Sequence, residues 1–340
     1  MVCFADENRS YSNEEETMTR ANLYDVAIVG GGAAGLSAAV ALGRSVRRVV
    51  VIDAGEPRNA SAEGAHNLLG REGTAPLTLL QAGRAEARSY GAELRPGRAV
   101  GVRREGDVFV LTLASGGELA ARRLILATGL ADELPDVPGL REHWGRRVLH
   151  CAYCHGWEVR GQLVGILGAG PQSIHQALLF RQLTEHVTLF RHTMPEPSDE
   201  QWEQLAALGI EVVDGAVARV DGDGDKLAVV LETGQTANVD ALVVAPRFMA
   251  RGELFEQLRG QLVDHPMGRF IPTGPMGATD VAGVWAAGNS SDLSAMVSSA
   301  AGAGVAAGVA VNADLIAEEA HAAVESRVAT SQLSNPSPAR

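Results

Sequence analysis

The octapeptide CAYCHGWE, from Cys151 to Glu158, contains the residues of this chain that are best suited to chemistry. Two cysteines separated by two residues can bind a metal, close a structural disulfide or run a redox cycle. A zinc site needs about four ligands, commonly from a second C-x-x-C or a histidine pair. The only other cysteine is Cys3, and His150 and His155 stand too close to the pair for ordinary zinc-finger spacing. We therefore expect no metal and favour redox chemistry.

The spacing of Cys151 and Cys154 suits a reversible disulfide because it brackets one turn of helix. A helix N-terminus also stabilises the thiolate, which is the reactive form of cysteine. His155 follows the second cysteine directly, and an imidazole can both accept and donate a proton at neutral pH. Cys151, Cys154 and His155 are our candidate catalytic residues. The alternative for His155 is an exposed histidine that caps a helix.

The bulk properties of the chain argue against several classes of partner. Its 340 residues are enough for two domains, since single cores stop growing near ~250–300 residues. A net charge of −12 argues against nucleic acid, which binds basic surfaces. No apolar run approaches the ~20 residues of a membrane helix, so we expect no membrane partner. Three cysteines are too few for a secreted disulfide scaffold, which predicts a cytoplasmic location.

The two ends of the chain, residues 1–22 and 328–340, are expected to be disordered tails. The first is rich in acids and lacks the basic and apolar regions of a signal peptide. The second is polar and ends in the sequence NPSPAR, which is unsuited to a packed core.

A dinucleotide-binding fingerprint begins at Tyr24. The run 24–29 predicts a strand, GGGAAG a tight turn, LSAAVALG a helix, and VRRVVVID a second strand that ends at Asp53. Such glycines let the backbone approach a pyrophosphate at the helix N-terminus, and a terminal acid binds a ribose. The alternative is a glycine-rich helix start with no ligand. The candidate cofactor-binding residues are Gly30, Gly32, Ala33, Ala34, Gly35, Asp53 and Ala54.

The same arrangement recurs 138 positions later (168 − 30). LVGIL, from residue 163, predicts a strand; GAGPQS contains Gly168 and Gly170; a helix follows, then the strand HVTLF, which ends at Arg191. Ser173 replaces the third glycine. Arg191 stands where NAD binders place an acid, and a cation there suits a 2′-phosphate, which favours NADP(H) over NAD(H). The alternative for Arg191 is a solvated charge at a strand end.

Two further apolar runs, LILATG at 124–129 and GVWAAGN at 283–289, end in small residues, and a helix is expected over 296–315. They match motifs of flavoproteins that contain two dinucleotide-binding domains. The first fingerprint and the last motif belong to one domain, so the second fingerprint must lie in an inserted domain. We expect an FAD-binding domain over 23–137 and 250–327, and an NADP(H)-type domain over 138–249. The crossovers are predicted near Pro135–Pro138 and Arg247–Arg251.

The ordered motifs GGGAAG, VIDAGEPRN, HNLLG, LATG, CAYCHG, GAGPQS and GVWAAGN resemble the low-molecular-weight thioredoxin reductase family. The resemblance runs from about Tyr24 to about Ile316. It implies an α/β fold with two Rossmann-like domains, the second inserted into the first, bound FAD and a homodimer. It also implies that Cys154 faces the flavin and that Cys151 exchanges with substrate. The further cofactor-binding residues that it implies are Asn67, Thr128, Gly129, Gly288, Asn289, Ala295, Met296 and Val297.

Three positions depart from the reductases that the chain resembles. His155 replaces the usual Asp after the second cysteine. Those reductases usually have two adjacent arginines and a third soon after, whereas this chain has only Arg191 there. We therefore expect weakened binding of a nicotinamide nucleotide at this site. Asn289 replaces the usual Asp of the last FAD motif, and Ala295-Met296-Val297 replaces Arg-Gln-Ala near the flavin.

The CxYCH form of the motif is similar to the thioredoxin-reductase-like dithiol oxidases of natural-product pathways, of the gliotoxin, holomycin and romidepsin type. This similarity implies an enzyme of antibiotic biosynthesis that closes a disulfide in a small dithiol and passes electrons through FAD to O2, with H2O2 as product. One alternative is an NADPH-dependent reductase of thioredoxin. A more distant one is a flavin redox sensor, although no output segment is evident.

Overall fold

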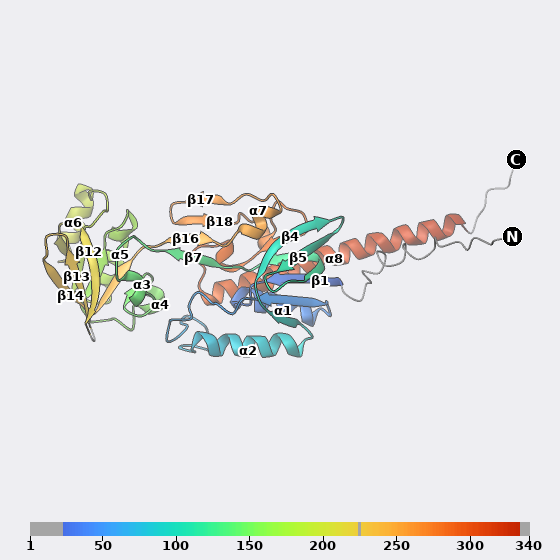
Figure 1. Cartoon of the computed structure of the whole chain (residues 1–340), viewed down its shortest axis with the longest axis horizontal. Helices are drawn as coiled ribbons and strands as arrows, with labels where there is room; N and C mark the ends of the chain where they lie inside the picture. The colour runs from blue at the N-terminus through green and yellow to red at the C-terminus, as the bar shows by residue number, and fades with distance from the viewer. Residues whose placement is uncertain (1–22, 224–225, 334–340) are drawn as a thin grey trace, which may run out of the picture.

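The structure is a computed structural model that describes residues 23–223 and 226–333. The tail predicted over 1–22 lies outside the described residues, as do residues 334–340. Two α/β units lie next to each other along the long axis, and the long helix α8 extends beyond the first of them (Figure 1).

The first unit is built on a sheet in the order β3-β2-β1-β6-β5-β4, in which β19 also pairs with β6. The strands β3, β2, β1, β6 and β19 run parallel, whereas β4 and β5 form an antiparallel extension. Its elements are β1 (Leu23–Val29), α1 (Ala33–Arg44), β2 (Val49–Asp53), α2 (Pro76–Ser89), β3 (Glu93–Pro96), β4 (Ala99–Glu105), β5 (Val108–Leu113), β6 (Glu118–Leu126), β19 (Val284–Ala286), η3 (Gly288–Ser290) and α8 (Val297–Leu333).

Alternate residues of β1 point to opposite faces of this sheet, as strand geometry requires. Val26 and Ile28 belong to a core that α1 and α8 cover, while Ala27 and Val29 belong to the core on the other face. Because both faces are covered, the parallel strands consist of nearly continuous apolar runs.

The second unit contains a parallel sheet in the order β11-β10-β9-β15-β8 and an antiparallel sheet in the order β12-β13-β14. Its elements are α3 (Leu140–His143), β8 (Val148–Leu149), α4 (Ala152–His155), β9 (Val164–Leu167), α5 (Gln172–Arg181), β10 (Val187–Phe190), α6 (Asp199–Ala207), β11 (Glu211–Val213), β12 (Val217–Asp223), β13 (Lys226–Leu231), β14 (Thr236–Val239) and β15 (Ala241–Val244). Strands β9 and β10 with helix α5 repeat the arrangement of β1, β2 and α1.

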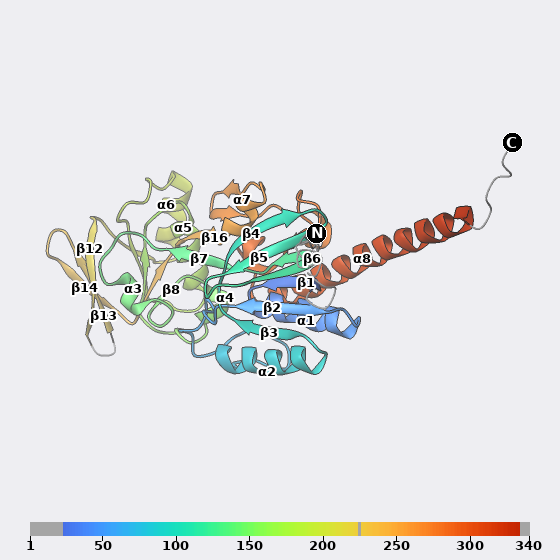
Figure 2. The ribbon, with the colours of Figure 1, turned by 45° about the vertical axis from the view of Figure 1, so that its right-hand side comes forward.

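A pair of antiparallel strands connects the two units: β7 (Leu130–Glu133) and β16 (Arg247–Ala250), with Glu133 opposite Arg247. They belong to a small sheet in the order β17-β18-β16-β7, completed by β17 (Val263–His265) and β18 (Gly268–Phe270), next to α7 (Glu253–Gln257) and η2 (Pro275–Gly277). The chain enters and leaves the second unit through this pair (Figure 2). The predicted insertion of one Rossmann-like domain into another is therefore confirmed. The predicted domain limits stay a prediction, since the connecting strands pair with each other.

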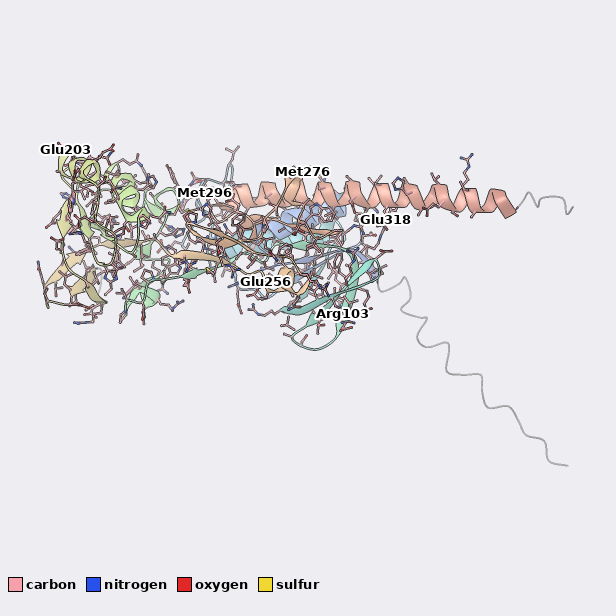
Figure 3. The ribbon with its side chains drawn as sticks, turned by 90° about the horizontal axis from the view of Figure 1, so that it is seen from above. Arg103, Glu203, Glu256, Met276, Met296 and Glu318 are labelled. Carbon is pink, nitrogen blue, oxygen red and sulfur yellow. The ribbon has the colours of Figure 1, made fainter. Side chains whose placement is uncertain are left out.

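Helix α8 is longer than the sequence predicted. The expected helix covered 296–315, whereas α8 ends at Leu333 and so enters the segment 328–340 that was expected to be disordered. The correction has a physical reason, because the stretch after Leu315 is rich in alanine, the strongest helix former. Figure 3 shows α8 running from beside Met296, past Glu318, and away from the rest of the described chain.

The expectation that no segment has the length and composition of a membrane helix was also wrong. The segment Val297–Thr330 of α8 has that length, and an 18-residue window within it has a mean hydropathy of 1.5, because alanine and valine dominate that window. Helices in protein cores share this length and composition. In the first half of α8, Ala307, Val311 and Leu315 are fully buried. Close to where α8 leaves the body, Glu318 and Glu319 pair with Arg122 of β6.

Candidate redox-active site

The cysteine pair lies on the single turn of α4, with Cys151 as its N-cap residue. The amides of Cys154 and His155 both donate to Cys151 O, at 3.3 and 3.1 Å. This turn brings the two sulfurs within 2.6 Å of each other, and Cys154 Sγ donates to Cys151 Sγ. Both thiols are half-buried and carry no disulfide. The pair can therefore open and close a disulfide with only a small movement of its side chains.

The two thiols differ in proton affinity. The hydrogen bond from Cys154 lowers the pKa of Cys151 to about 7, although burial opposes this effect, and amides of the turn add to it. The same hydrogen bond, together with burial, raises the pKa of Cys154 above its ordinary value. Cys151 is thus the more readily ionised thiol and, since the thiolate is the nucleophile, the more reactive one. Cys151 is also the residue that the family resemblance assigns to exchange with substrate; that assignment stays a prediction.

His155 ends the same turn, and both of its ring nitrogens are buried without a hydrogen-bond partner. Burial lowers the pKa of His155 below its ordinary value, and the nearby Glu158 only partly offsets this. The imidazole is therefore neutral at physiological pH and has a vacant lone pair to accept a proton. It does not occupy the N-cap of α4, because Cys151 does, so the capping alternative for His155 is wrong.

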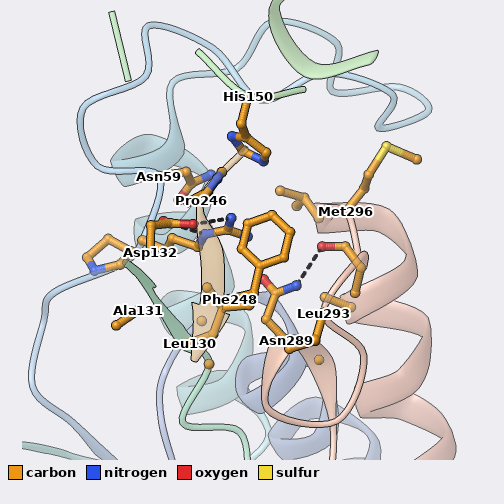
Figure 4. A pocket seen from close by; sticks show the side chains of 18 of the residues that line it. Asn59, Leu130, Ala131, Asp132, His150, Pro246, Phe248, Asn289, Leu293 and Met296 are labelled. Atoms are coloured by element: carbon orange, nitrogen blue, oxygen red, sulfur yellow. Dashed lines mark hydrogen bonds and ion pairs between the residues drawn. The ribbon is translucent and has the colours of Figure 1, made fainter. Parts of the chain in front are cut away.

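A cavity of about 1160 Å³ is lined by residues of both units. It is lined by the ends of β1 and β2, by the segments that follow β6 and β19, by the start of α8, by the cysteine turn, and by the start of α5. Figure 4 shows part of this cavity, with Asn289 and Met296 on one side and Asp132, His150 and Phe248 on the other. The predicted site residues that line it are Gly30, Gly32, Ala33, Ala34, Asp53, Ala54, Thr128, Gly129, Cys151, Cys154, His155, Gly170, Gly288, Asn289, Ala295, Met296 and Val297.

Four predicted site residues do not line the cavity, namely Gly35, Asn67, Gly168 and Arg191. Gly35 and Gly168 are buried against neighbouring backbone, where a side chain would not fit. A Cβ on Gly35 would lie 1.9 Å from Gly30 O, and one on Gly168 would lie 2.6 Å from Arg191 O. Asn67 instead joins the two units, because its Nδ2 donates to Tyr153 O at 2.7 Å.

The first fingerprint has the shape that FAD needs. Gly30 has a φ of +107°, and a Cβ there would lie 2.1 Å from Ala127 O, so only glycine fits between β1 and β6. A Cβ on Gly32, the N-cap of α1, would meet no protein atom within 4 Å and would project into open space where a pyrophosphate can approach. No side chain caps the amides of the first turn of α1, which leaves them available to an anion.

Hydrogen bonds within the protein orient two polar side chains of the cavity, Asp53 and Asn289. Asp53 Oδ2 accepts from Arg84 Nη2 at 3.0 Å, which holds the carboxylate at the end of β2, where a ribose is expected. Asn289 Nδ2 donates to Ala295 O at 2.9 Å and to Asp292 O at 3.1 Å. Its amide oxygen can then accept from a hydroxyl, a role that the usual Asp would also play. These residues fit FAD.

The second fingerprint is built differently. Gly170 lines the cavity, and a Cβ there would meet nothing within 4 Å. Ser173 is fully buried, and its hydroxyl donates to Leu167 O at 3.4 Å, so the extra oxygen is satisfied. Arg191 forms ion pairs with Asp214, at 2.8 Å, and with Glu196, and it lies over the Trp202 ring. A 2′-phosphate would have to compete with two carboxylates for this guanidinium.

One group in the cavity was not predicted from the sequence. Arg58 forms a two-pronged ion pair with Asp132, at 2.8 and 2.6 Å, and its guanidinium lies 4.9 Å from the centre of the Phe248 ring. His150 packs edge-on against Phe248 and stacks on Trp144. Burial and the charge of Arg58 lower the pKa of His150 to about 4, so this imidazole is neutral. Arg58 and Asp132 are 74 positions apart, and no spacing rule joins them.

Comparison with known proteins identifies the family. The chain belongs to the pyridine nucleotide-disulphide oxidoreductase family, whose model matches residues 24–325. It is an FAD-dependent thiol–disulfide oxidoreductase of the thioredoxin reductase-like type, as the motifs indicated. Among the described residues, no group of three or more His, Cys, Asp or Glu side chains is arranged to hold a metal ion.

Relatives and solved structures match along most of their lengths. Thioredoxin reductase tcpT of Claviceps purpurea is 31% identical over 315 residues, which are 88% of this chain and 97% of that protein. Thioredoxin reductase sirT of Leptosphaeria maculans is 31% identical over 86% of this chain and 94% of its own. The crystal structure of HlmI has a TM-score of 0.85 and 42% identity, and covers 90% of this chain and 97% of that one. An oxidoreductase from Agrobacterium tumefaciens has a TM-score of 0.82 and 35% identity, over 86% and 98% of the two chains.

Proposed function

We propose that this protein is a dithiol oxidase, which closes a disulfide in a small-molecule dithiol at the expense of O2. The observation that carries the proposal is the pairing of the easily ionised Cys151 with a neutral, unpartnered His155 on one turn of helix. A base beside the cysteines serves an enzyme that withdraws protons from substrate thiols. The CxYCH resemblance to natural-product dithiol oxidases points to the same direction of electron flow.

The reaction begins with the Cys151–Cys154 disulfide closed. A substrate thiolate attacks Cys151 Sγ, forms a mixed disulfide and releases Cys154 as a thiolate. His155 then takes the proton of the second substrate thiol. The thiolate so formed attacks the substrate sulfur of the mixed disulfide, which closes the product and releases Cys151 as a thiolate. The substrate has lost two electrons and two protons, and the cysteine pair holds both electrons.

FAD, when bound at the first fingerprint, would supply the two-electron redox chemistry between the reduced cysteine pair and O2, with H2O2 as the product. The residues that would hold FAD are the turn 30–34, Asp53, Thr128 and the segments around Asn289 and Met296. The remaining task of the chain is to keep Cys154 on the flavin side of the turn and Cys151 accessible to substrate.

Steady-state assays test the proposal. With a small dithiol and no nicotinamide nucleotide, the holoenzyme should produce disulfide and H2O2 in equal amounts. Without O2, turnover should stop after about two equivalents of dithiol, because the cysteine pair and the flavin each accept two electrons. A holoenzyme that makes no peroxide from dithiols, yet oxidises NADPH rapidly in the presence of thioredoxin, would refute the oxidase proposal.

A thioredoxin reductase is the second candidate, because the relatives tcpT and sirT carry that name. His155 would then return a proton to the leaving thiolate. The two carboxylates paired with Arg191 would compete with the 2′-phosphate of NADPH and weaken its binding, which favours the oxidase. We also propose, for the oxidase, a homodimer, a cytoplasmic location and a role in antibiotic biosynthesis. NADP(H) and thioredoxin are the partners that the reductase candidate would use. Light scattering of the holoenzyme tests the homodimer.

A further inference from the structure

Three large apolar side chains are exposed beside the cysteine turn. Tyr153, between the two cysteines, and Trp157, one turn later, are each 67% exposed, and Leu69 is fully exposed. Scattered apolar side chains are normal on a surface, but contiguous ones mark an interaction site. Only 4% of the residues of this chain are aromatic, so two exposed aromatic rings within seven positions of Cys151 need an explanation.

Contacts across the boundary between the units place the segment that contains Leu69 beside the segment that contains Tyr153 and Trp157. Asn67, two positions before Leu69, donates from Nδ2 to Tyr153 O at 2.7 Å. His66 Nε2 lies 3.5 Å from Glu158 Oε1, next to Trp157. The segment 66–72 of the first unit therefore lies along the segment 153–158 of the second. Figure 2 shows α4 at this boundary. We call Leu69, Tyr153 and Trp157 the apolar rim.

The ring of Trp157 is held in place. The Arg160 guanidinium lies 3.9 Å from the ring centre, and Arg160 Nη1 donates to Trp157 O at 2.6 Å. One face of the indole is thus covered by a cation, while two thirds of the side chain stay exposed. A ring fixed in this way loses little conformational entropy when a flat ligand stacks on it.

The size of the apolar rim favours a small molecule over a protein. An aromatic side chain offers ~150–250 Å², so Tyr153 and Trp157, each 67% exposed, expose on the order of 300 Å² together, to which Leu69 adds a smaller area. A stable protein interface needs about 800 Å² per partner. The charges around the rim are mixed, because Glu72 and Glu158 both approach His66, and Arg160 lies on Trp157. A neutral apolar ring suits this surface better than an ion.

We propose that the apolar rim binds the ring of a small, neutral, ring-bearing dithiol and presents its sulfurs to Cys151. This inference rests on the proposed dithiol oxidase function and adds the chemical class of the substrate. Leu69, Tyr153 and Trp157 are specificity residues, since they do not touch the reacting sulfurs. The rim spans both units, so the substrate surface is complete only while the two are docked.

The test compares two dithiols with similar reactive groups, 1,2-benzenedimethanethiol, which has an aromatic ring, and dithiothreitol, which has none. The readout is the ratio of their kcat/KM values, measured as H2O2 production by the holoenzyme. Trp157→Ala and Tyr153→Ala should each lower this ratio about tenfold, equivalent to ~1.4 kcal/mol. Tyr90→Ala is the matched control, because Tyr90 is 42% exposed and does not line the cavity, and it should leave the ratio unchanged.

Other results overturn the inference. Equal losses with both dithiols would mean that the rings only support the fold. An unchanged ratio with dissociation of a dimer would make the rim a contact between copies of the chain, and a loss confined to thioredoxin as substrate would make it a protein-docking surface. Calorimetry with the inert thioether 1,2-bis(methylthiomethyl)benzene separates this inference from the proposed function. If the thioether binds and Trp157→Ala weakens that binding, the rim is a ligand site. If the same protein oxidises neither dithiol, the oxidase proposal alone is refuted.

Discussion

At the scale of single residues, the two cysteines lie three positions apart but have pKa values shifted in opposite directions: the pKa of Cys151 is lowered and that of Cys154 is raised. The turn of α4 directs amides and the Cys154 thiol at Cys151, whereas Cys154 keeps its proton because it donates that hydrogen bond and is itself buried. A pKa of about 7 keeps roughly half of Cys151 as thiolate at neutral pH once the disulfide is open.

The role of Cys154 as proton donor can be tested in the reduced protein. Cys154→Ala removes the hydrogen bond that has the largest effect on Cys151, so the pKa of Cys151 should rise from about 7 towards the ordinary thiol value. The rate of alkylation by iodoacetamide as a function of pH measures this shift. In wild type the rate should reach half its plateau near pH 7, and in the variant one to two pH units higher. A midpoint that stays near 7 would assign the stabilisation of the thiolate to another group.

His155 should act as a base, and its pKa, held below the ordinary value by burial, keeps it neutral over the working range. His155→Ala should lower kcat for dithiol oxidation by about 10²–10⁴-fold near pH 7. The deficit should shrink as pH rises through ~8.5, because substrate thiols then ionise without help. The pH profile of kcat is the measurement.

His321→Ala on the exposed part of α8 is the matched control and should not change that profile. A His155→Ala deficit that is constant from pH 6 to 9 would show that the imidazole positions the cysteines and transfers no proton.

At the scale of elements, local patterns predicted the strands and helices of both fingerprints, because each is one contiguous unit of strand, turn and helix. Patterns of this kind carry no information on long-range pairing. They could not show that Arg58 pairs with Asp132, nor that Arg191 pairs with Asp214, since those partners are distant in the sequence. The length of α8 was missed for a different reason: an exposed alanine-rich helix has no amphipathic pattern to follow.

The two fingerprints should differ in what they bind. A Cβ at Gly32 or at Gly170 meets no protein atom, so valine at either position should leave the fold intact. Gly32→Val fills the space in front of α1 and should reduce bound FAD by about tenfold or more, measured after denaturing extraction. Gly170→Val should retain FAD, because it alters only the second fingerprint. Equal loss of FAD from both variants would mean that the cofactor depends on both turns.

Two glycines of α8 test how the helix packs on the first unit. A Cβ at Gly304 would lie 2.0 Å from Ala34 O, in the first turn of α1, whereas one at Gly302 would meet nothing within 4 Å. Gly302→Ala should therefore raise the free energy of unfolding by ~0.5–1 kcal/mol through helix propensity. Gly304→Ala should lower it by ~1–3 kcal/mol through overpacking. Urea denaturation measures both, and equal effects would place α8 away from α1.

At the scale of the whole molecule, the first unit is assembled from two separated parts of the chain. Strand β19 and the start of α8 complete the sheet and the cavity that β1, β2 and β6 begin. The second unit lies between those parts, joined through β7 and β16 alone among the described strands. The sequence order of the motifs was enough to predict this insertion, because it depends only on which segments share a domain.

This connectivity has a consequence for synthesis on the ribosome. β19 begins 158 residues after β6 ends (284 − 126). At ~5–20 residues per second, the first sheet waits roughly 8–30 s for its last strand. The second unit emerges complete in that interval and should fold first. Ribosome-stalled chains that end near residue 280 should therefore show protease protection of the second unit and not of the first; the opposite order would refute this. Flavin then enters a protein whose redox-active turn is already in place.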